Sequence, residues 1–271
     1  MRPNPVKSKI KNGELTIGAE YGWAVHGLDM NIMGYLAQAG YDFVVIDTEH
    51  SPWYGLEGCV TAVMAAEAAG IVPFIRISDS FPILATKALD MGAYGVWGVP
   101  HVDTKKDIAK VVANAKYKLP DWEYGARGHA TNLRADGYGA YNTPEMLEKW
   151  QRFSNEETMV AASPLESLEG INNIEEIISV KGLDMISLSV GDITQCLGHP
   201  GQPDHPKVME VRDKICEQCM ERGMPVYFPM GPSRPKLVKH YYDKGVRVFY
   251  ATPNIRQHFM DTMTKMREIC K

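Results

Sequence analysis

Three ionisable side chains follow an apolar run in the segment YDFVVIDTEH, residues 41–50. The run has the β-branched, uncharged composition of a strand buried on both faces of a parallel sheet. Asp47, Glu49 and His50 come next, and because an unpaired buried charge is costly, we expect them where the strand leaves the core. Acids and a histidine at such a strand end suit proton transfer in a barrel enzyme, but a solvated loop explains the segment equally well.

Two further carboxylates occupy comparable positions later in the chain. Glu166 follows the apolar segment TMVAASP, and Asp192 follows LDMISLSV. Two acids on neighbouring strand ends could bind one divalent cation and leave its other positions to water and substrate oxygens, a set that suits Mg²⁺ or Mn²⁺. Taken singly, each acid also fits a structural role, Glu166 in the first turn of a helix and Asp192 as a helix cap.

A single arginine, Arg76, ends the otherwise apolar segment IVPFIR. An arginine in such a strand must meet an anion or a carboxylate, which makes it a candidate for stabilising a developing negative oxygen. A structural salt bridge, for example with Asp90, accounts for it equally well at this point.

Apolar strands and helical segments alternate along the chain, and together they must position these side chains. Helices are expected at about 30–40, 56–69, 82–92, 104–115, 172–182, 208–222, 235–245 and 255–270, each preceded by a short apolar strand. The result is about eight βα units, which predicts an α/β fold of the (β/α)8 TIM barrel type. A doubly wound sheet is the alternative, but no GxGxxG follows an early strand.

One interval, between Pro100 and Glu166, is too long for a single βα unit. Its middle, residues 117–142, is rich in Gly, Tyr, Asp and Arg and has little periodicity. We expect a long loop insertion over the active site rather than a linker, and therefore a single TIM-barrel domain over residues 1–271. Aromatic residues in this loop suggest a lid over the substrate: Trp122, Tyr124, His129, Tyr138 and Tyr141.

Composition narrows the class of protein. The net charge is −4, and no basic block interrupts the chain, which argues against nucleic acid as a partner. No stretch approaches 18 consecutive apolar residues, and the first residues lack the apolar core of a signal peptide, so we expect no membrane partner. The five cysteines do not form a disulfide framework, and the CxxC of Cys216 and Cys219 lies in a helical pattern, as expected in the cytoplasm.

Several stretches resemble the HpcH/HpaI class II pyruvate aldolases, notably VVIDTEHS, FIRI, ALDMGA and YGARG. The most specific part is the block LESLEGINNIEEIISVKGLDMISLSVGDITQCLGHPGQPDHPKV, in which the acid spacing, the VKGLD turn and the LGHPGQPDHP loop all agree. The resemblance covers about residues 40–206. It implies a TIM barrel that acts on pyruvate-like substrates and forms a homo-oligomer, a trimer or a hexamer.

The resemblance also implies roles for the residues at the strand ends. Glu166 and Asp192 would bind the divalent metal, which would chelate the carboxylate and keto oxygens of a pyruvate-like unit. Arg76 would stabilise the enolate oxygen, and His50 would move protons, with Asp47 setting its orientation and basicity.

Three more positions have supporting roles by the same resemblance. Glu49 and Asp90 match family acids near the site. The backbone N–H groups of Gly191 and Asp192, where a helix is expected to begin, would receive the substrate carboxylate.

The expected function is a metal-dependent aldolase, a carbon–carbon lyase of the aldehyde-lyase type. It would cleave or form a C–C bond in a 4-hydroxy-2-oxoacid, giving pyruvate or a close analogue and an aldehyde through a metal-stabilised enolate. The alternatives are a decarboxylase or CoA-ester lyase that uses the same site, and a barrel that binds an oxoacid without catalysis. Ser189, Val190 and Gly191 replace the usual Gly-Pro-Ala, and His101 replaces an apolar residue, which leaves the choice of substrate open.

Overall fold

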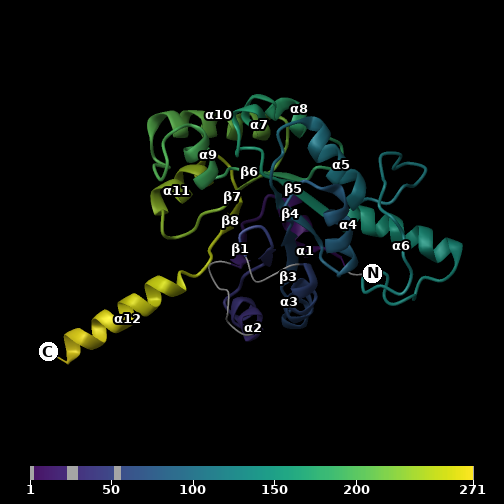
Figure 1. Cartoon of the computed structure of the whole chain (residues 1–271), viewed down its shortest axis with the longest axis horizontal. Helices are drawn as coiled ribbons and strands as arrows, with labels where there is room; N and C mark the ends of the chain where they lie inside the picture. Colours follow the sequence, from purple (N-terminus) through teal and green to yellow (C-terminus); the bar gives the residue numbers. More distant parts are fainter. Residues whose placement is uncertain (1–2, 23–29, 52–55, 271) are drawn as a thin grey trace.

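Eight parallel strands close into a barrel in the computed structural model, which describes residues 3–22, 30–51 and 56–270 (Figure 1). Each strand pairs with its neighbours in chain order, and β8 pairs with β1. The predicted (β/α)8 TIM barrel is therefore confirmed. The strands are β1 (Thr16–Tyr21), β2 (Phe43–Asp47), β3 (Val72–Arg76), β4 (Gly95–Val99), β5 (Met159–Ala162), β6 (Met185–Ser187), β7 (Val226–Phe228) and β8 (Val248–Tyr250).

Helices surround the barrel, except that α1 belongs to its base and α12 extends away from it (Figure 1). Their bounds are α1 (Pro5–Lys11), α2 (Asn31–Gln38), α3 (Leu56–Ala69), α4 (Pro82–Asp90), α5 (Lys105–Ala115), α6 (Pro144–Glu157), α7 (Leu168–Asn172), α8 (Ile174–Ile178), α9 (Gly191–Cys196), α10 (Pro206–Glu221), α11 (Pro235–Asp243) and α12 (Ile255–Ile269). No helix in these described ranges has the length and apolar character needed to cross a membrane.

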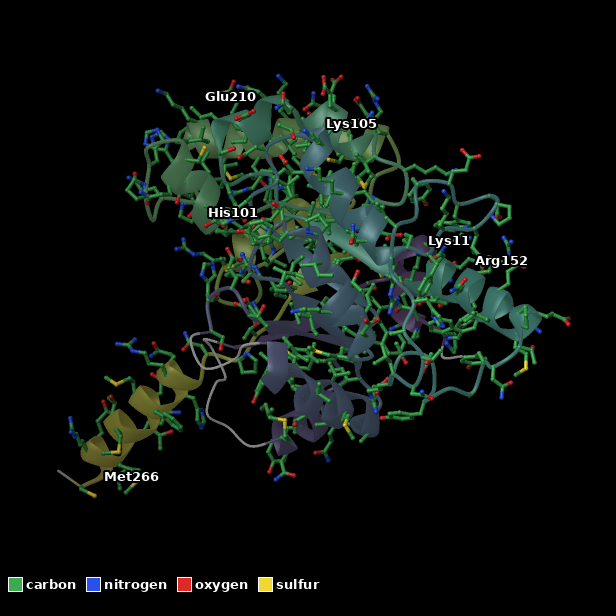
Figure 2. All side chains as sticks on the ribbon, turned by 45° about the vertical axis from the view of Figure 1, so that its right-hand side comes forward. Lys11, His101, Lys105, Arg152, Glu210 and Met266 are labelled. Carbon is green, nitrogen blue, oxygen red and sulfur yellow. The ribbon has the colours of Figure 1, made fainter. Side chains whose placement is uncertain are left out.

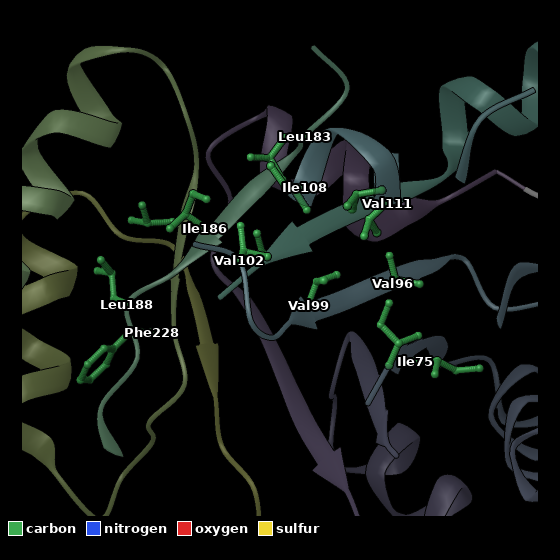
Figure 3. Close-up of a cluster of buried hydrophobic side chains, with 14 of the residues drawn as sticks. Ile75, Val96, Val99, Val102, Ile108, Val111, Leu183, Ile186, Leu188 and Phe228 are labelled. Atoms are coloured by element: carbon green, nitrogen blue, oxygen red, sulfur yellow. The ribbon is translucent and has the colours of Figure 1, made fainter. Parts of the chain in front are cut away.

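Side chains alternate across each strand, and this alternation creates two apolar cores. On β2, Val44 and Ile46 pack toward the surrounding helices, whereas Phe43 and Val45 fill the barrel interior. Figure 3 shows the outer layer, in which strand residues such as Val96 meet helix residues of α5. The inner layer is closed by aromatic rings, with Trp97 4.6 Å from Phe43, 4.8 Å from Phe74 and 5.2 Å from Tyr227 between ring centroids.

The same alternation places charged groups at one end of the barrel interior. Asp47 follows Phe43 and Val45 on the inward face of β2, and Arg76 pairs with it in register on β3. Interior positions are thus apolar at the amino end of the strands and ionisable at the carboxyl end, which is where active sites of this fold lie.

The insertion at residues 117–142 lies at the amino end of the barrel, which corrects the prediction of an active-site lid. It follows α5, and a helix in a βα unit returns the chain from the carboxyl end to the amino end of the strands. Tyr117 bonds the side chain of Asn155 on α6, and Arg134 packs on Gly92, just before β4. In Figure 2, Arg152 of α6 lies on the side of Lys11 in α1, and His101 lies on the other side.

Two further elements differ from the sequence expectations. Helices α1 and α6 were not predicted, because the polar start of the chain and the long interval before β5 showed no clear apolar periodicity. The helix expected at 172–182 is the shorter α8, and α7, which was not predicted, lies before it and meets it at Asn173. The side chain of Asn173 donates to the carbonyl of Asp103, which fixes the junction against the loop after β4.

Candidate active site

Arg76 is the centre of the charged cluster at the carboxyl end of the barrel. One terminal nitrogen lies 2.5 Å from Glu49 Oε2, and the other lies 3.8 Å from Glu20 Oε1 and 3.9 Å from Asp47 Oδ2. Burial alone would lower the pKa of Arg76, but the carboxylates of Glu49 and Asp47 raise it above its ordinary value. The guanidinium therefore stays charged and is held by acids on three sides.

The turn after β2 is organised by Asp47. Its Oδ1 accepts hydrogen bonds from the backbone N–H groups of Glu49 at 2.9 Å and His50 at 3.2 Å. These bonds direct the Glu49 carboxylate toward Arg76 and leave the His50 imidazole about half exposed at the rim. Asp47 thus acts on the position of His50 through the backbone of the turn.

Glu166 lies after β5 and is held by a backbone amide from the neighbouring strand end. Its Oε2 accepts from the N–H of His101 at 2.9 Å, while its Oε1 is buried without a hydrogen-bond partner among the described residues. His101 has a φ of 54°, an uncommon value for a residue with a side chain. This conformation belongs to the turn that presents its N–H to the carboxylate, while its imidazole is exposed near Asp79.

Asp192 lies in the first turn of α9, directly after Gly191. Its Oδ2 accepts a hydrogen bond from the hydroxyl of Ser189 at 2.8 Å, so one carboxylate oxygen is oriented from within the same turn. Amide groups in the first turn of a helix have no intrahelical acceptor, and the position of Gly191 is open on the side where a Cβ would stand.

The acids of the cluster act on one another electrostatically. Burial raises the pKa of Glu166, and the nearby carboxylate of Asp192 raises it further, while the hydrogen bond from His101 opposes the shift. Burial likewise raises the pKa of Glu49 against the attraction of Arg76, with Glu166 and Asp47 adding to the rise. The carboxylate of Asp192 is therefore close enough to disfavour the charged form of Glu166, and a cation between the two acids would relieve that repulsion.

Comparison with known proteins identifies the group to which this barrel belongs. The family model described as HpcH/HpaI aldolase/citrate lyase matches residues 22–233. The chain belongs to this family. The 2-dehydro-3,6-dideoxy-6-sulfogluconate aldolase of Pseudomonas putida is 28% identical over 242 residues, which cover 86% of this chain and 84% of that protein. The 5-keto-4-deoxy-D-glucarate aldolase of Shigella boydii is 26% identical over 225 residues, 82% of this chain and 80% of that protein.

Solved structures of the HpcH/HpaI family share the barrel. A family protein from Burkholderia cenocepacia superposes with a TM-score of 0.86 at 24% identity and covers 99% of this chain and 100% of that one. The citrate synthase SbnG superposes with a TM-score of 0.81 at 28% identity and 97% coverage of both chains. The resemblance to HpcH/HpaI aldolases and the class of enzyme, a carbon–carbon lyase, are thereby confirmed.

Aldolases of the HpcH/HpaI family generally depend on a divalent metal, and the donor atoms of this chain fit such an ion. The buried, unpartnered Oε1 of Glu166 and the carboxylate of Asp192 are hard oxygen donors, which Mg²⁺ and Mn²⁺ prefer. Within the described ranges, no group of three or more His, Cys, Asp or Glu side chains could hold a metal ion. These two acids would therefore be a set of two protein ligands, with water and substrate completing the coordination.

Asp90 is the one predicted site residue that the structure places elsewhere. It is the last residue of α4, at the amino end of the barrel, and its Oδ1 accepts from Arg127 at 2.7 Å. The alternative salt bridge between Asp90 and Arg76 is therefore wrong, and the supporting role of Asp90 at the site stays a prediction. Arg76 ends β3 at the carboxyl end of the barrel, and α4 then returns the chain to the amino end, where Asp90 lies. The two residues are therefore apart although they are close in sequence.

Three residues near Arg76 were missed by sequence reasoning. Glu20 lies at the inward face of β1, with its backbone N–H bonded to the hydroxyl of Thr252 at 2.9 Å. Tyr227 is buried, which raises its pKa, and Ser187 bonds its hydroxyl. Gly98 has a φ of 64°, a conformation that glycine adopts readily. A Cβ at this position would stand 2.9 Å from the Tyr227 hydroxyl oxygen and 3.6 Å from Arg76 Nε, so the absence of a side chain leaves room for both groups. The period-two alternation of β1 and β7 was the available signal.

Proposed function

We propose that this HpcH/HpaI aldolase cleaves, or forms, a C–C bond in a 4-hydroxy-2-oxoacid, with pyruvate or a close analogue and an aldehyde as the other partners of the reaction. The observation that carries the proposal is the cluster in which Arg76 and the acids Glu166 and Asp192 interact electrostatically at the carboxyl end of the barrel. The relatives named as aldolases of sugar acids support the same substrate class.

The carboxylates of Glu166 and Asp192 would hold the divalent cation, Mg²⁺ or Mn²⁺. When bound, the cation withdraws electrons from the 2-oxo group of the substrate. Arg76 would donate hydrogen bonds to the same oxygen as negative charge develops on it during C–C cleavage. Its preset position, fixed by Glu49 and Asp47, means that little reorganisation is needed at the moment of reaction.

Proton transfer is assigned to His50, at the rim of the cluster. Its imidazole lies 3.7 Å from Glu49 Oε1 and is about half exposed, so it can exchange protons with water. Asp47 holds the turn that carries it. The first-turn amides of Gly191 and Asp192 would receive the substrate carboxylate, because they are free of intrahelical acceptors.

Exchange of methyl protons tests the proposal directly. Metal-loaded protein is incubated with pyruvate in deuterated water, and the methyl signal is followed by NMR. We expect exchange that stops on chelation and in Glu166→Gln and Asp192→Asn, because an enolate then loses its electron acceptor.

A control variant tests whether the loss of any nearby acid, rather than of a site acid, stops the exchange. Glu169→Gln removes an exposed acid on α7, three residues from Glu166, and should exchange like wild type. Binding of pyruvate without exchange would replace the aldolase proposal by a passive oxoacid-binding barrel. If exchange persisted in both Glu166→Gln and Asp192→Asn, these two acids would not be needed to form the enolate.

We also propose that the enzyme is a homo-oligomer in which α12 packs on another copy of the chain. Helix α12 extends from β8 into solvent instead of covering the barrel (Figure 1), and all its described side chains are exposed. One side carries large apolar groups, which a monomer rarely exposes together: Phe259, Met260, Met263, Met266 and Ile269.

Light scattering after size-exclusion chromatography tests this assembly. Wild type should elute as an oligomer, and Met263→Glu combined with Met266→Glu should shift it toward the monomer. Lys265→Glu, in the same helix, is the control. The cysteines in the structure are free thiols, in keeping with the reducing cytoplasm in which we propose that the enzyme acts.

A further inference from the structure

A cavity of about 330 Å³ lies at the amino end of the barrel, on the opposite side from the Arg76 cluster. The insertion and α6 form one wall, and the residues around the starts of β4 and β5 form the other. In Figure 2, Arg152 marks α6, the helix that contributes to the cavity wall, and it lies away from His101. A volume of this size lies at the lower end of the range for small-molecule sites.

Two arginines from the insertion line the cavity. The side chain of Arg127 is 2% exposed and bonds Asp90 through one terminal nitrogen, while its Nε is buried without a hydrogen-bond partner among the described residues. Arg134 has the same arrangement, with an ion pair to Glu67 and an Nε that is buried and unpartnered in the described part of the chain. The two Nε atoms have almost no exposed surface, so a ligand would meet these guanidinium groups through terminal N–H groups, of which the ion pair to the acid uses one nitrogen in each residue.

Aromatic rings form the rest of the lining. Tyr141 stacks on Trp150 with centroids 5.7 Å apart and planes 17° apart, and both line the cavity. Behind them, the Arg127 guanidinium lies 4.6 Å from the ring of Tyr117. Tyr138 is exposed at the cavity edge. Flat apolar walls beside guanidinium donors match a flat molecule with an anionic group.

A buried lysine lies behind the lining. Lys116 is fully buried, and its ammonium donates to the carbonyls of Asn155 at 2.7 Å and Thr158 at 2.6 Å. Thr158 itself lines the cavity. Burial lowers the pKa of Lys116 to about 7, and the positive charge of Arg127 contributes. With a pKa of about 7 this amine is only partly charged at neutral pH, so the positive charge that an anion in the cavity would meet comes from the two arginines.

We propose that this cavity is a second ligand site, separate from the catalytic cluster, that binds a small aromatic carboxylate. The carboxylate meets the guanidinium groups of Arg127 and Arg134, and the ring lies against Tyr141 and Trp150. The site is built from the insertion, not from the βα loops that carry the catalytic residues. Its occupancy is therefore independent of the divalent metal and of the oxoacid.

Isothermal titration calorimetry with benzoate tests this site on the full-length protein. We expect saturable binding by wild type and by Arg76→Gln, because the catalytic cluster plays no part. Arg134→Gln should bind at least about tenfold more weakly, since a hydrogen bond to a charged group is lost. Arg152→Gln removes an arginine on α6 that pairs with Asp121 outside the cavity, and it should bind like wild type.

A second variant covers the case in which the loss of a buried ion pair disturbs the insertion. Ala135→Phe fills the cavity without removing a charge, and it should also weaken benzoate binding. Cyclohexanecarboxylate and acetate serve as non-aromatic probes and should bind more weakly than benzoate. Absence of saturable binding by wild type, wild-type affinity in both cavity variants, or loss of binding in Arg76→Gln would each overturn the proposal.

Discussion

Charged side chains lie at both ends of the barrel, but their arrangement differs between the two ends. At the carboxyl end, several acids gather around one guanidinium, and the buried Glu166 Oε1 has no hydrogen-bond partner among the described residues. At the amino end, ion pairs join different elements, as between Arg127 and Asp90 or between Lys7 and Asp184 at 3.0 Å. The carboxyl end therefore gathers several acids in one cluster, whereas the amino end has separate ion pairs that each connect two elements of the fold.

This contrast indicates which end performs chemistry. Burial and neighbouring acids raise the pKa of Glu166 and Glu49, so their charged forms disfavour the folded state until a cation neutralises them, and perturbed groups of this kind are concentrated at functional sites. Ion pairs and backbone bonds at the base hold α1, the insertion and α6 on the strands. In this fold, charge changes at the carboxyl end should alter turnover, and those at the amino end should alter stability.

The largest effect is expected from Glu166→Gln. Turnover should fall by more than about 10³-fold, because a direct metal ligand should matter more than the outer-shell partners of metal sites. Since burial raises the pKa of Glu166, its charged form disfavours folding above that pKa. The metal-free variant should therefore melt at a higher temperature than metal-free wild type at pH 7. Steady-state kinetics measures the fall in turnover, and calorimetry measures the melting temperatures of the metal-free proteins. A lower melting temperature for the metal-free variant would contradict the view that the charged Glu166 disfavours folding.

Arg76→Lys should have the next largest effect. Lysine keeps the charge but loses the forked donors that reach Glu49 and the substrate oxygen together. We expect kcat to fall by about 10²- to 10³-fold, as on loss of an oxyanion donor. A change confined to KM would mean that Arg76 binds substrate and transition state equally.

Ser189→Ala tests whether the Ser189 hydroxyl supports Asp192, the second of the two proposed metal ligands. The Ser189 hydroxyl bonds Asp192 Oδ2 at 2.8 Å, and outer-shell partners of this kind contribute about 10- to 100-fold in metal affinity. Titration with Mn²⁺ monitored by electron paramagnetic resonance measures the change. Ser179→Ala, in the turn after α8, is the control and should bind Mn²⁺ like wild type.

Lys116→Met should leave turnover unchanged and alter how stability depends on pH. The pKa of Lys116 is lowered to about 7 in the fold, from 10.5, so the unfolded chain binds more protons between these values. The unfolding free energy of wild type should therefore rise from pH 7 to pH 10, by about 1 kcal/mol or more relative to the variant. Urea titrations of both proteins at several pH values measure the unfolding free energy. If it depended on pH in the same way in wild type and in the variant, the lowered pKa of Lys116 would be refuted.

The order of elements was predictable because each βα unit carries its own local pattern. The apolar run before Asp47 and the acids after TMVAASP and LDMISLSV predicted strand ends, and closure of a parallel barrel brings such ends together. The sequence could not show that His101 would hold Glu166 through its backbone N–H, because that depends on an uncommon φ in a turn. The side chain, which the sequence comparison emphasised, is exposed.

Asp90 and the insertion show the limit most clearly. The composition of the insertion suggested an active-site lid, and the family resemblance placed Asp90 near the site. Only the direction of the chain decides which end of a barrel a loop occupies: segments after strands meet at the carboxyl end, and segments after helices meet at the amino end. The sequence by itself determined a (β/α)8 barrel with Asp47, Arg76, Glu166 and Asp192 at strand ends. The tertiary structure alone placed Asp90 against Arg127, because their contact joins elements far apart in the chain.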